Sequence, residues 1–433
     1  MQLSHPSARR DPSLQRLGPR LIYFTRTDLP SRKANSIQSM NTCWELARQG
    51  ADVILVVQQL TQSRRECFEF YGLPEEPRLR LVSLSLPMAG DFNDWKGRTF
   101  RGWLRSFLNK WATSGSVLFT RDPSGLELLR AVDALELDVP IKTIFEVHKV
   151  SFMVKASHQA ERGRSLEHPK VVARVAERRE LEETVYRSAD GIVCTSDNAR
   201  RLLDEHFAAH APIRVIPNGT RIPRQSDGTP RLATALDDTK RDIDVLYVGQ
   251  LYAWKGVDQL VRAMKRLPGR RLEIVGGNIA ADLDRVQDLI RNQGLADRVT
   301  LHGYVPPSQV QEFLQRARVG VIPLPEEGFV EATLFTSPLK LFELWQQGVP
   351  VVASGVPSIR ELVPEGKEAL LVEPDSLDAL AEGLQRLLED RQLAASLVAS
   401  GATRVQDYSW ENRATQILDF LHSLKIPHLG NEG

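Results

Sequence analysis

The sequence predicts an α/β fold with parallel sheets, arranged as two doubly wound domains. The first observation is that short apolar runs alternate with helical patterns along nearly the whole chain. Runs of Val, Ile and Leu without polar alternation suit strands buried on both faces, as in parallel sheets. The second is a break in this alternation at residues 218–242, and the third is a length of 433 residues, enough for two ordinary domains.

The expected strands follow the apolar runs in order. In the first half they are Leu21–Thr25, Val53–Val57, Leu79–Leu84, Val117–Thr120, Ile141–Glu146, Gly191–Thr195 and Ile213–Pro217. In the second half they are Ile243–Gly249, Arg271–Gly276, Val299–Gly303, Val319–Leu324, Val351–Ser354 and Ala369–Val372. Helical spacing of apolar residues lies between them, as in Ser36–Arg48, Ser308–Ala317 and Leu377–Leu388. This alternation indicates βαβ units.

The chain is expected to divide into five stretches. Residues 1–19 are polar, lack the apolar core of a signal peptide and predict a disordered lead-in. Residues 20–220 and 243–408 predict two Rossmann-like domains, and residues 221–242, rich in Pro, Gly, Asp, Thr and Arg, predict the linker between them. The amphipathic stretch at 409–425 is expected to form a helix that packs back across the junction.

The composition excludes several classes of protein. Hydrophobic residues make up 42% and charged residues 26%, as in ordinary globular domains, and the net charge of +1 indicates no nucleic-acid partner. Cys43, Cys67 and Cys194 have neither metal-binding spacing nor a disulfide framework, so we expect a cytoplasmic location. No apolar run approaches the roughly 20 residues that a membrane span needs.

Two loops of the second half follow predicted strands and are suited to hold a diphosphate. In an open parallel sheet, ligands bind beyond the carboxyl ends of the strands. Gly249 ends such a strand, and a glycine lets backbone approach a phosphate closely. Lys255 follows at the start of the next helix, where it can neutralise the charge of a departing diphosphate. Taken alone, Lys255 equally fits an ordinary surface lysine.

The second loop has more specific features. Ser337 suits an N-cap and Pro338 the first helical position, so the N–H groups of Leu339 and Lys340 would point out of the helix terminus and form an anion site. Glu343 lies on the same helix face and could reach a ribose diol. The alternative is a capped core helix with an exposed Glu343. The apolar neighbours of this residue favour a functional role, because an unpaired carboxylate there would be costly.

With these motifs, the chain resembles the family 4 glycosyltransferases of the GT-B fold, in the subgroup with a Ser-Pro-x-Lys-x-x-Glu donor loop. The resemblance covers roughly residues 20 to 425, and the motifs follow the family's order. The matching stretches are Arg32–Gln38, Val215–Gly219, Val248–Val257, His302–Pro306, Ser337–Glu343 and Gly348–Ser354.

The resemblance implies a retaining, hexosyltransferase-type enzyme that moves a sugar from a UDP- or GDP-linked donor to a hydroxyl acceptor, in polysaccharide, glycolipid or glycoside biosynthesis. The N-terminal domain would bind the acceptor and the C-terminal domain the donor, with no metal and no cofactor. His148 and Lys255 would be catalytic. The donor-binding residues would be Gly249, Gln250, Tyr304, Thr336, Ser337, Leu339, Lys340 and Glu343, with a donor-phosphate loop at Asn35 and Ser36.

Two departures from the family keep other functions open. Many relatives carry an arginine at the position of Gln250 and a glutamate at that of Phe335. Glutamine supplies no charge, so the diphosphate would be held less strongly or with help from Lys340. The alternatives are a nucleotide-sugar-binding relative without transferase activity and a GT-B-fold sugar-nucleotide epimerase. His148 also fits a structural, hydrogen-bonded histidine.

A basic aromatic segment lies at residues 95–111. Trp95, Trp103 and Trp111 recur with other apolar residues at helical spacing, and lysines and arginines fill the positions between them. Such a helix can lie on an anionic membrane, which would place the protein peripherally at its inner face. The favoured reading is a helix that packs its apolar stripe on the N-terminal sheet.

Overall fold

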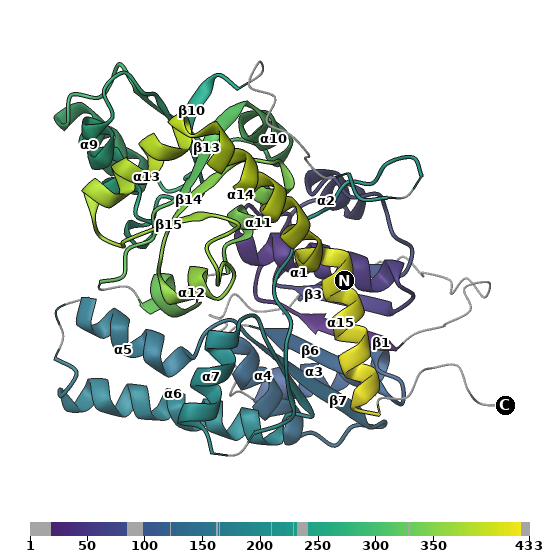
Figure 1. The fold of residues 1–433 in the computed structure, drawn as a ribbon. Coiled ribbons are helices and arrows are strands. Elements are labelled where there is room, and N and C mark those ends of the chain that lie inside the picture. The colour runs from purple at the N-terminus through teal and green to yellow at the C-terminus, as the bar shows by residue number, and fades with distance from the viewer. Residues whose placement is uncertain are drawn as a thin grey trace.

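The computed structural model of this chain contains two α/β units, each built on a parallel sheet (Figure 1). The predicted fold class is therefore confirmed. The residues that the structure describes are 19–84, 98–121, 123–161, 163, 165–208, 210–227, 229–231, 241–327, 330–335 and 337–425. Most of the predicted lead-in, and residues 232–240 of the predicted linker, lie outside these ranges.

The N-terminal sheet has seven strands in the order β5-β3-β1-β6-β7-β8-β9, and neighbouring strands are parallel. Leu21 of β1 pairs with Val53 on one side and Val117 on the other. These central strands are buried almost throughout, as their uninterrupted apolar runs predicted. The bounds are β1 Arg20–Phe24, β3 Asp52–Val57, β5 Leu79–Ser83, β6 Ser116–Arg121, β7 Ile141–Val147, β8 Gly191–Cys194 and β9 Ile213–Val215.

The C-terminal sheet has six strands in the order β12-β11-β10-β13-β14-β15, again parallel. Its bounds are β10 Ile243–Val248, β11 Leu272–Val275, β12 Val299–Gly303, β13 Ala317–Ile322, β14 Val351–Ser354 and β15 Leu370–Val372. A separate pair of strands, β2 (Asp28–Leu29) and β4 (Gln59–Leu60), was not predicted, because strands of two residues carry no periodicity.

Helices cover both faces of each sheet (Figure 1). Those of the N-terminal unit are α1 Ala34–Arg48, α2 Arg64–Phe70, α3 Arg98–Trp111, α4 Pro123–Asp133, α5 Ser151–Glu161, α6 Pro169–Ser188 and α7 Asp197–His206. Those of the C-terminal unit are η2 Ala253–Lys255, α8 Val257–Ala263, η3 Met264–Arg266, α9 Ala280–Asn292, α10 Pro307–Arg316, η4 Glu331–Phe335, α11 Leu339–Gln346, α12 Pro357–Arg360, α13 Leu377–Glu389, α14 Arg391–Arg404 and η5 Val405–Tyr408.

The last helix, α15 (Trp410–Ser423), leaves the C-terminal unit and lies along α1 of the N-terminal unit (Figure 1). Its buried residues Ala414, Ile417, Phe420 and Leu421 belong to the same apolar cluster as the strands β1 and β3. Burying one large apolar side chain stabilises a fold by roughly 1.5–3 kcal/mol, so Ile417, Phe420 and Leu421 attach this helix firmly to the N-terminal unit.

The chain crosses between the units at two adjoining segments. The N–H of Thr220 donates to the carbonyl of Tyr408 at 2.8 Å, and the N–H of Trp410 donates back to the carbonyl of Thr220 at 3.1 Å. Gly219 packs against this second segment so closely that a Cβ atom would lie 2.6 Å from the carbonyl carbon of Ser409. The two crossings therefore form one narrow junction, in which a side chain at 219 would force the segments apart.

The basic aromatic segment forms α3, whose apolar face packs on the N-terminal sheet, as the favoured reading predicted. Leu104 and Leu108 are fully buried in the core, and the rings of Trp103 and Phe107 stack at 5.2 Å. Trp95 lies outside the described residues. Within the described part of the chain, no helix combines the length and the hydropathy that a bilayer crossing requires.

Candidate active site

A cavity of about 360 Å³ lies between the two units, at the carboxyl ends of their strands. The residues that line it from the N-terminal unit are Ala34, Asn35, Gln38, Arg121, Phe145, Glu146, His148, Lys149, Ser151 and Asn218. Those from the C-terminal unit are Trp254, Lys255, Phe335, Ser337 and Leu339. The structure thus brings together five predicted site residues from distant parts of the chain, namely Asn35, His148, Lys255, Ser337 and Leu339.

Lys255 reaches the cavity from a tight turn between β10 and α8. The turn ends at Gly256, whose φ of 73° is left-handed and whose Cα faces the carbonyl oxygen of Pro323 so closely that any Cβ would collide with it. The Lys255 ammonium lies 3.9 Å from the centroid of the Trp254 ring. Burial, with a smaller contribution from the positive charge of Lys340, lowers the pKa of Lys255 to about 7.

The donor loop differs from its prediction at the helix start. The helix α11 begins at Leu339 with Pro338 as N-cap, and no side chain caps it. The ψ of Pro338 is 83°, which is not helical, so the proline stands before the helix rather than in its first turn. The N–H of Leu339 donates to the carbonyl of Ser337 at 2.9 Å. The predictions that Ser337 caps this helix and that the Leu339 amide is free for an anion are therefore wrong.

Lys340 and Glu343 lie together on the open side of α11. The Lys340 Nζ donates to Glu343 Oε2 at 2.8 Å, and about a third of each side chain is exposed. The opposite side of the helix is buried through Leu341, Phe342 and Trp345. Glu343 is therefore not an unpaired carboxylate in apolar surroundings, as the sequence argument assumed. Its predicted role at a ribose depends instead on its exposure and its ion pair.

The loop after β10 is held by backbone contacts. The N–H of Gly249 donates to the carbonyl of Val275 at 2.9 Å, and the Tyr247 hydroxyl donates to the carbonyl of Gln250 at 2.6 Å. The side-chain oxygen of Gln250 is buried and accepts no hydrogen bond from the described residues. Neither Gly249 nor Gln250 lines the cavity, so this loop shapes the site mainly by placing Lys255.

The remaining predicted residues also lie outside the cavity lining. Tyr304 is half-buried, and the guanidinium of Arg32 stacks on its ring at 3.4 Å, which makes a contact between the two units. Ser36 is buried and its hydroxyl donates to the carbonyl of Lys33 at 3.0 Å, so it holds the loop rather than facing the cavity. Thr336 lies outside the described residues.

His148 enters the cavity beside a buried carboxylate that the sequence analysis missed. His148 Nε2 lies 2.5 Å from Oε1 of Glu146, which is completely buried at the end of β7. Burial alone would raise the pKa of Glu146, but Arg413, His148 and Arg121 together hold it well below the ordinary value. Glu146, Arg121 and Gln38 therefore join the site. The signal for Glu146 in the sequence was a carboxylate between the apolar residues Phe145 and Val147 near the end of a strand.

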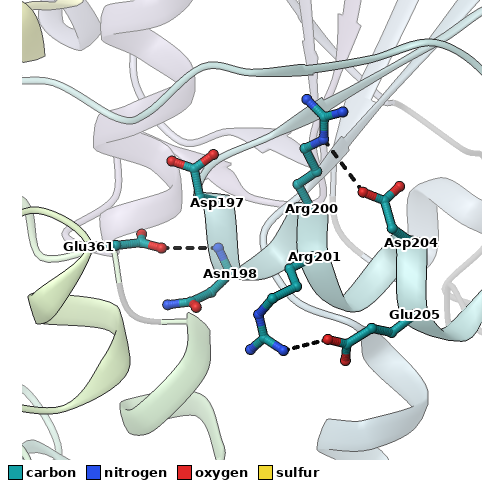
Figure 2. Close-up of a pocket in the computed structure, with 7 residues that line it drawn as sticks. All are labelled: Asp197, Asn198, Arg200, Arg201, Asp204, Glu205 and Glu361. Atoms are coloured by element: carbon teal, nitrogen blue, oxygen red, sulfur yellow. Dashed lines mark hydrogen bonds and ion pairs between the residues drawn. The ribbon is translucent and has the colours of Figure 1, made fainter.

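A second hollow lies on α7, where Arg200 pairs with Asp204 at 3.6 Å (Figure 2). Arg201 pairs with Glu205 at 2.6 Å on the same helix. Glu361, from the C-terminal unit, accepts a hydrogen bond from the N–H of Asn198 at 3.0 Å. Burial, and then the nearby Asp197, raise the pKa of Glu361 to about 7 against this hydrogen bond. We interpret this region as a contact between the units rather than as a reaction site.

No group of three or more His, Cys, Asp and Glu side chains among the described residues is placed to hold a metal ion. The cavity offers cationic and amide groups instead, which suit an anionic ligand. Independence from metal remains a prediction.

Two family models match the chain. Residues 37–219 match "Glycosyl transferase 4-like domain" and residues 242–390 match "Glycosyl transferases group 1". A D-inositol 3-phosphate glycosyltransferase from Corynebacterium urealyticum is 28% identical over 273 residues, covering 59% of this chain and 61% of that protein. The protein of the same name from Acidothermus cellulolyticus is 33% identical over 254 residues, covering 55% and 54%. The chain thus spans little more than half the length of these relatives.

Solved structures share the whole architecture at low sequence identity. A sucrose-phosphate synthase from Thermosynechococcus elongatus aligns with a TM-score of 0.72 at 22% identity, covering 94% of this chain and 99% of the other. Anabaena HepE in complex with UDP-glucose aligns with a TM-score of 0.66 at 15% identity, covering 93% and 99%.

Proposed function

The chain belongs to the family 4 glycosyltransferases of the GT-B fold, and we propose that it transfers a glycosyl group from a nucleotide-diphosphate sugar to a hydroxyl acceptor. The observation that carries this proposal is the meeting of Lys255 and His148 in one cavity between the two units. A cation from the donor-side unit and a histidine from the acceptor-side unit face the same space, as transfer between two bound substrates requires.

The diphosphate of the donor lies, on this proposal, against Lys255. As the bond between sugar and phosphate breaks, negative charge grows on the leaving phosphate. A charged lysine then stabilises the transition state more than the ground state, which raises kcat. Lys340 and Glu343 bind the ribose end of the donor from the open side of α11. No metal is required in this scheme, and the configuration of the sugar is retained.

The first donor and acceptor to test follow from the named relatives. HepE was crystallised with UDP-glucose, and the inositol-phosphate glycosyltransferases are named for a phosphorylated polyol. We therefore place UDP ahead of GDP as the donor nucleotide and a hydroxyl of a sugar or polyol as the acceptor. The buried free thiols of Cys43, Cys67 and Cys194 support a reducing, cytoplasmic location.

The proposal is tested by thermal shift of the purified chain with UDP, GDP and ADP sugars, with and without EDTA, followed by measurement of UDP release from UDP-glucose. Lys255→Ala should lower kcat for UDP release and also weaken UDP binding. Lys265→Ala, at an exposed lysine of the same unit, is the matched control and should change neither. If no sugar nucleotide binds, the proposal fails.

A nucleotide-sugar-binding relative without turnover is the second candidate. Gln250 and Phe335 favour this candidate, because many relatives carry a charged residue at each position. Phe335 is 8% exposed and packs in the apolar cluster of the N-terminal unit, whereas many relatives have a glutamate at this position that contacts the donor. Binding of UDP-glucose without UDP release over hours would support this candidate. An epimerase of the same fold would instead change the sugar while it stays attached to UDP.

Peripheral membrane contact is a further part of the proposal. Because α3 buries its apolar face, any contact would be electrostatic, through the exposed Arg101 and Arg105. Sedimentation with anionic vesicles should then be lost in the double variant Arg101→Glu with Arg105→Glu. Absence of sedimentation by the unaltered chain would exclude the contact.

A further inference from the structure

We infer that Arg413, on the C-terminal helix α15, is a positioning residue for His148 and acts through Glu146. Arg413 does not line the cavity, and its side chain is 1% exposed. It belongs to a helix that follows the C-terminal unit in sequence but packs on the N-terminal unit. The inference deepens the proposed function, but the contact geometry can be tested independently of turnover.

The guanidinium of Arg413 bonds three different elements of the N-terminal unit. Its Nε donates to Thr42 Oγ1 of α1 at 3.2 Å, and its first terminal nitrogen donates to the carbonyls of Ile216 and Pro217 at 2.7 and 3.0 Å. Its second terminal nitrogen lies 2.8 Å from Oε2 of Glu146. The planar guanidinium is therefore held in one orientation, with one terminal nitrogen against the carboxylate of Glu146.

Glu146 in turn joins Arg413 to the cavity. Its Oε2 faces Arg413, while its Oε1 accepts from Gln38 Nε2 at 2.8 Å and lies 2.5 Å from His148 Nε2. A completely buried carboxylate stays charged only beside a cation. Arg413 contacts the carboxylate directly and is the largest of the charges that lower its pKa, ahead of His148 and Arg121.

A charged Glu146 determines what His148 offers to a substrate. A carboxylate can only accept a hydrogen bond, so it keeps a proton on Nε2 of the neighbouring imidazole and holds the ring plane. Without Arg413, Glu146 would become protonated or move, and both changes release the ring. Arg413 thus orients His148 indirectly, through Glu146. Buried hydrogen-bonding partners orient the histidine ligands of metal sites in the same way.

The junction between the units gives this link a further consequence. Arg413 follows Trp410 by one helical turn, and Trp410 hydrogen-bonds the crossing segment at Thr220. The carbonyls of Ile216 and Pro217, which Arg413 also holds, lead into the same segment. The orientation of His148 therefore depends on the correct seating of α15 at the junction.

The direct test is the imidazole NMR spectrum of the full chain labelled with ¹⁵N-histidine. We expect a downfield Nε2–H signal, assigned by its loss in His148→Asn. Arg413→Gln should remove or shift this signal, and Arg413→Lys should restore most of it. Thr415→Val is the matched control, because the Thr415 hydroxyl on the same helix donates to Gln49 just after α1 rather than to Glu146. A His148 signal unchanged in Arg413→Gln would overturn the inference.

The functional test separates kcat from binding. Arg413→Gln should lower kcat for UDP release from UDP-glucose at least tenfold, while the Kd for UDP changes less than twofold, because Lys255, Lys340 and Glu343 lie on the other unit. A kcat within twofold of the unaltered chain would overturn the inference. If Arg413→Gln does not fold, the double variant Arg413→Met with Glu146→Gln removes both charges of the buried pair together. This variant should fold but have a low kcat. A kcat equal to that of the unaltered chain would refute the positioning role of Arg413. Failure of UDP to bind the unaltered chain would refute the proposed function, and the NMR result would still decide the role of Arg413.

Discussion

Binding of a nucleoside diphosphate should draw a proton from solution onto Lys255. With a pKa of about 7, this lysine is only about 10% protonated at pH 8 in the free protein. A bound diphosphate supplies the negative charge that burial and Lys340 oppose, so it should return the pKa toward the ordinary value near 10.4. Binding at pH 8 should therefore take up about 0.9 proton, and the Kd should weaken by up to tenfold per pH unit above 7.

Isothermal titration of UDP at pH 8 in buffers of different ionisation enthalpy measures this uptake directly. The observed enthalpy should rise with the ionisation enthalpy of the buffer, with a slope near 0.9 proton. The pH range 7.5–9 avoids titration of the terminal phosphate, whose pKa lies near 6. Lys255→Arg keeps the charge permanently and should bind UDP with a slope near zero. Binding of UDP to the unaltered chain with no proton uptake would refute this account of Lys255.

Three further predictions follow from single contacts. Gly256→Ala should lower the free energy of unfolding by ~1–3 kcal/mol or more in chemical denaturation, because position 256 has a left-handed backbone and a Cβ there would collide with Pro323. Gly269→Ala is the control, because position 269 is also left-handed but has open space around it. Equal losses in the two variants would contradict the predicted clash. Because the pKa of Glu361 is raised to about 7 in the fold, the folded state binds more protons than the unfolded state above pH 4.5. The free energy of unfolding should therefore fall by about 1–3 kcal/mol from pH 4.5 to 7. Glu361→Gln should reduce this dependence on pH, and an unchanged dependence would contradict the raised pKa of Glu361. Glu343→Ala should weaken UDP binding about tenfold while kcat at saturation changes little; an unaltered Kd would remove Glu343 from the donor site.

Much of the fold could be predicted because its signals are local. Each buried parallel strand is visible in the sequence as an apolar run, and the rule that ligands bind at the carboxyl ends of such strands predicted a site at Lys255. The family resemblance added Asn35 and His148 to that site. The structure gathers these three residues in one cavity. The start of the helix α11 was predicted wrongly because it depends on packing between distant parts of the chain. Ser337 and Pro338 have local helix-start preferences, but the path of the chain around the cavity places Pro338 just before the helix.

Periodicity and short motifs are enough to predict the α/β class, the order of the strands along the chain and the family to which the motifs belong. Only the packing of distant elements shows that Arg413 pairs with the buried Glu146 and that both lie behind His148. A buried ion pair between elements so far apart in sequence leaves no local pattern. Its members are recognised only when folding removes water from the carboxylate and brings the arginine into contact with it.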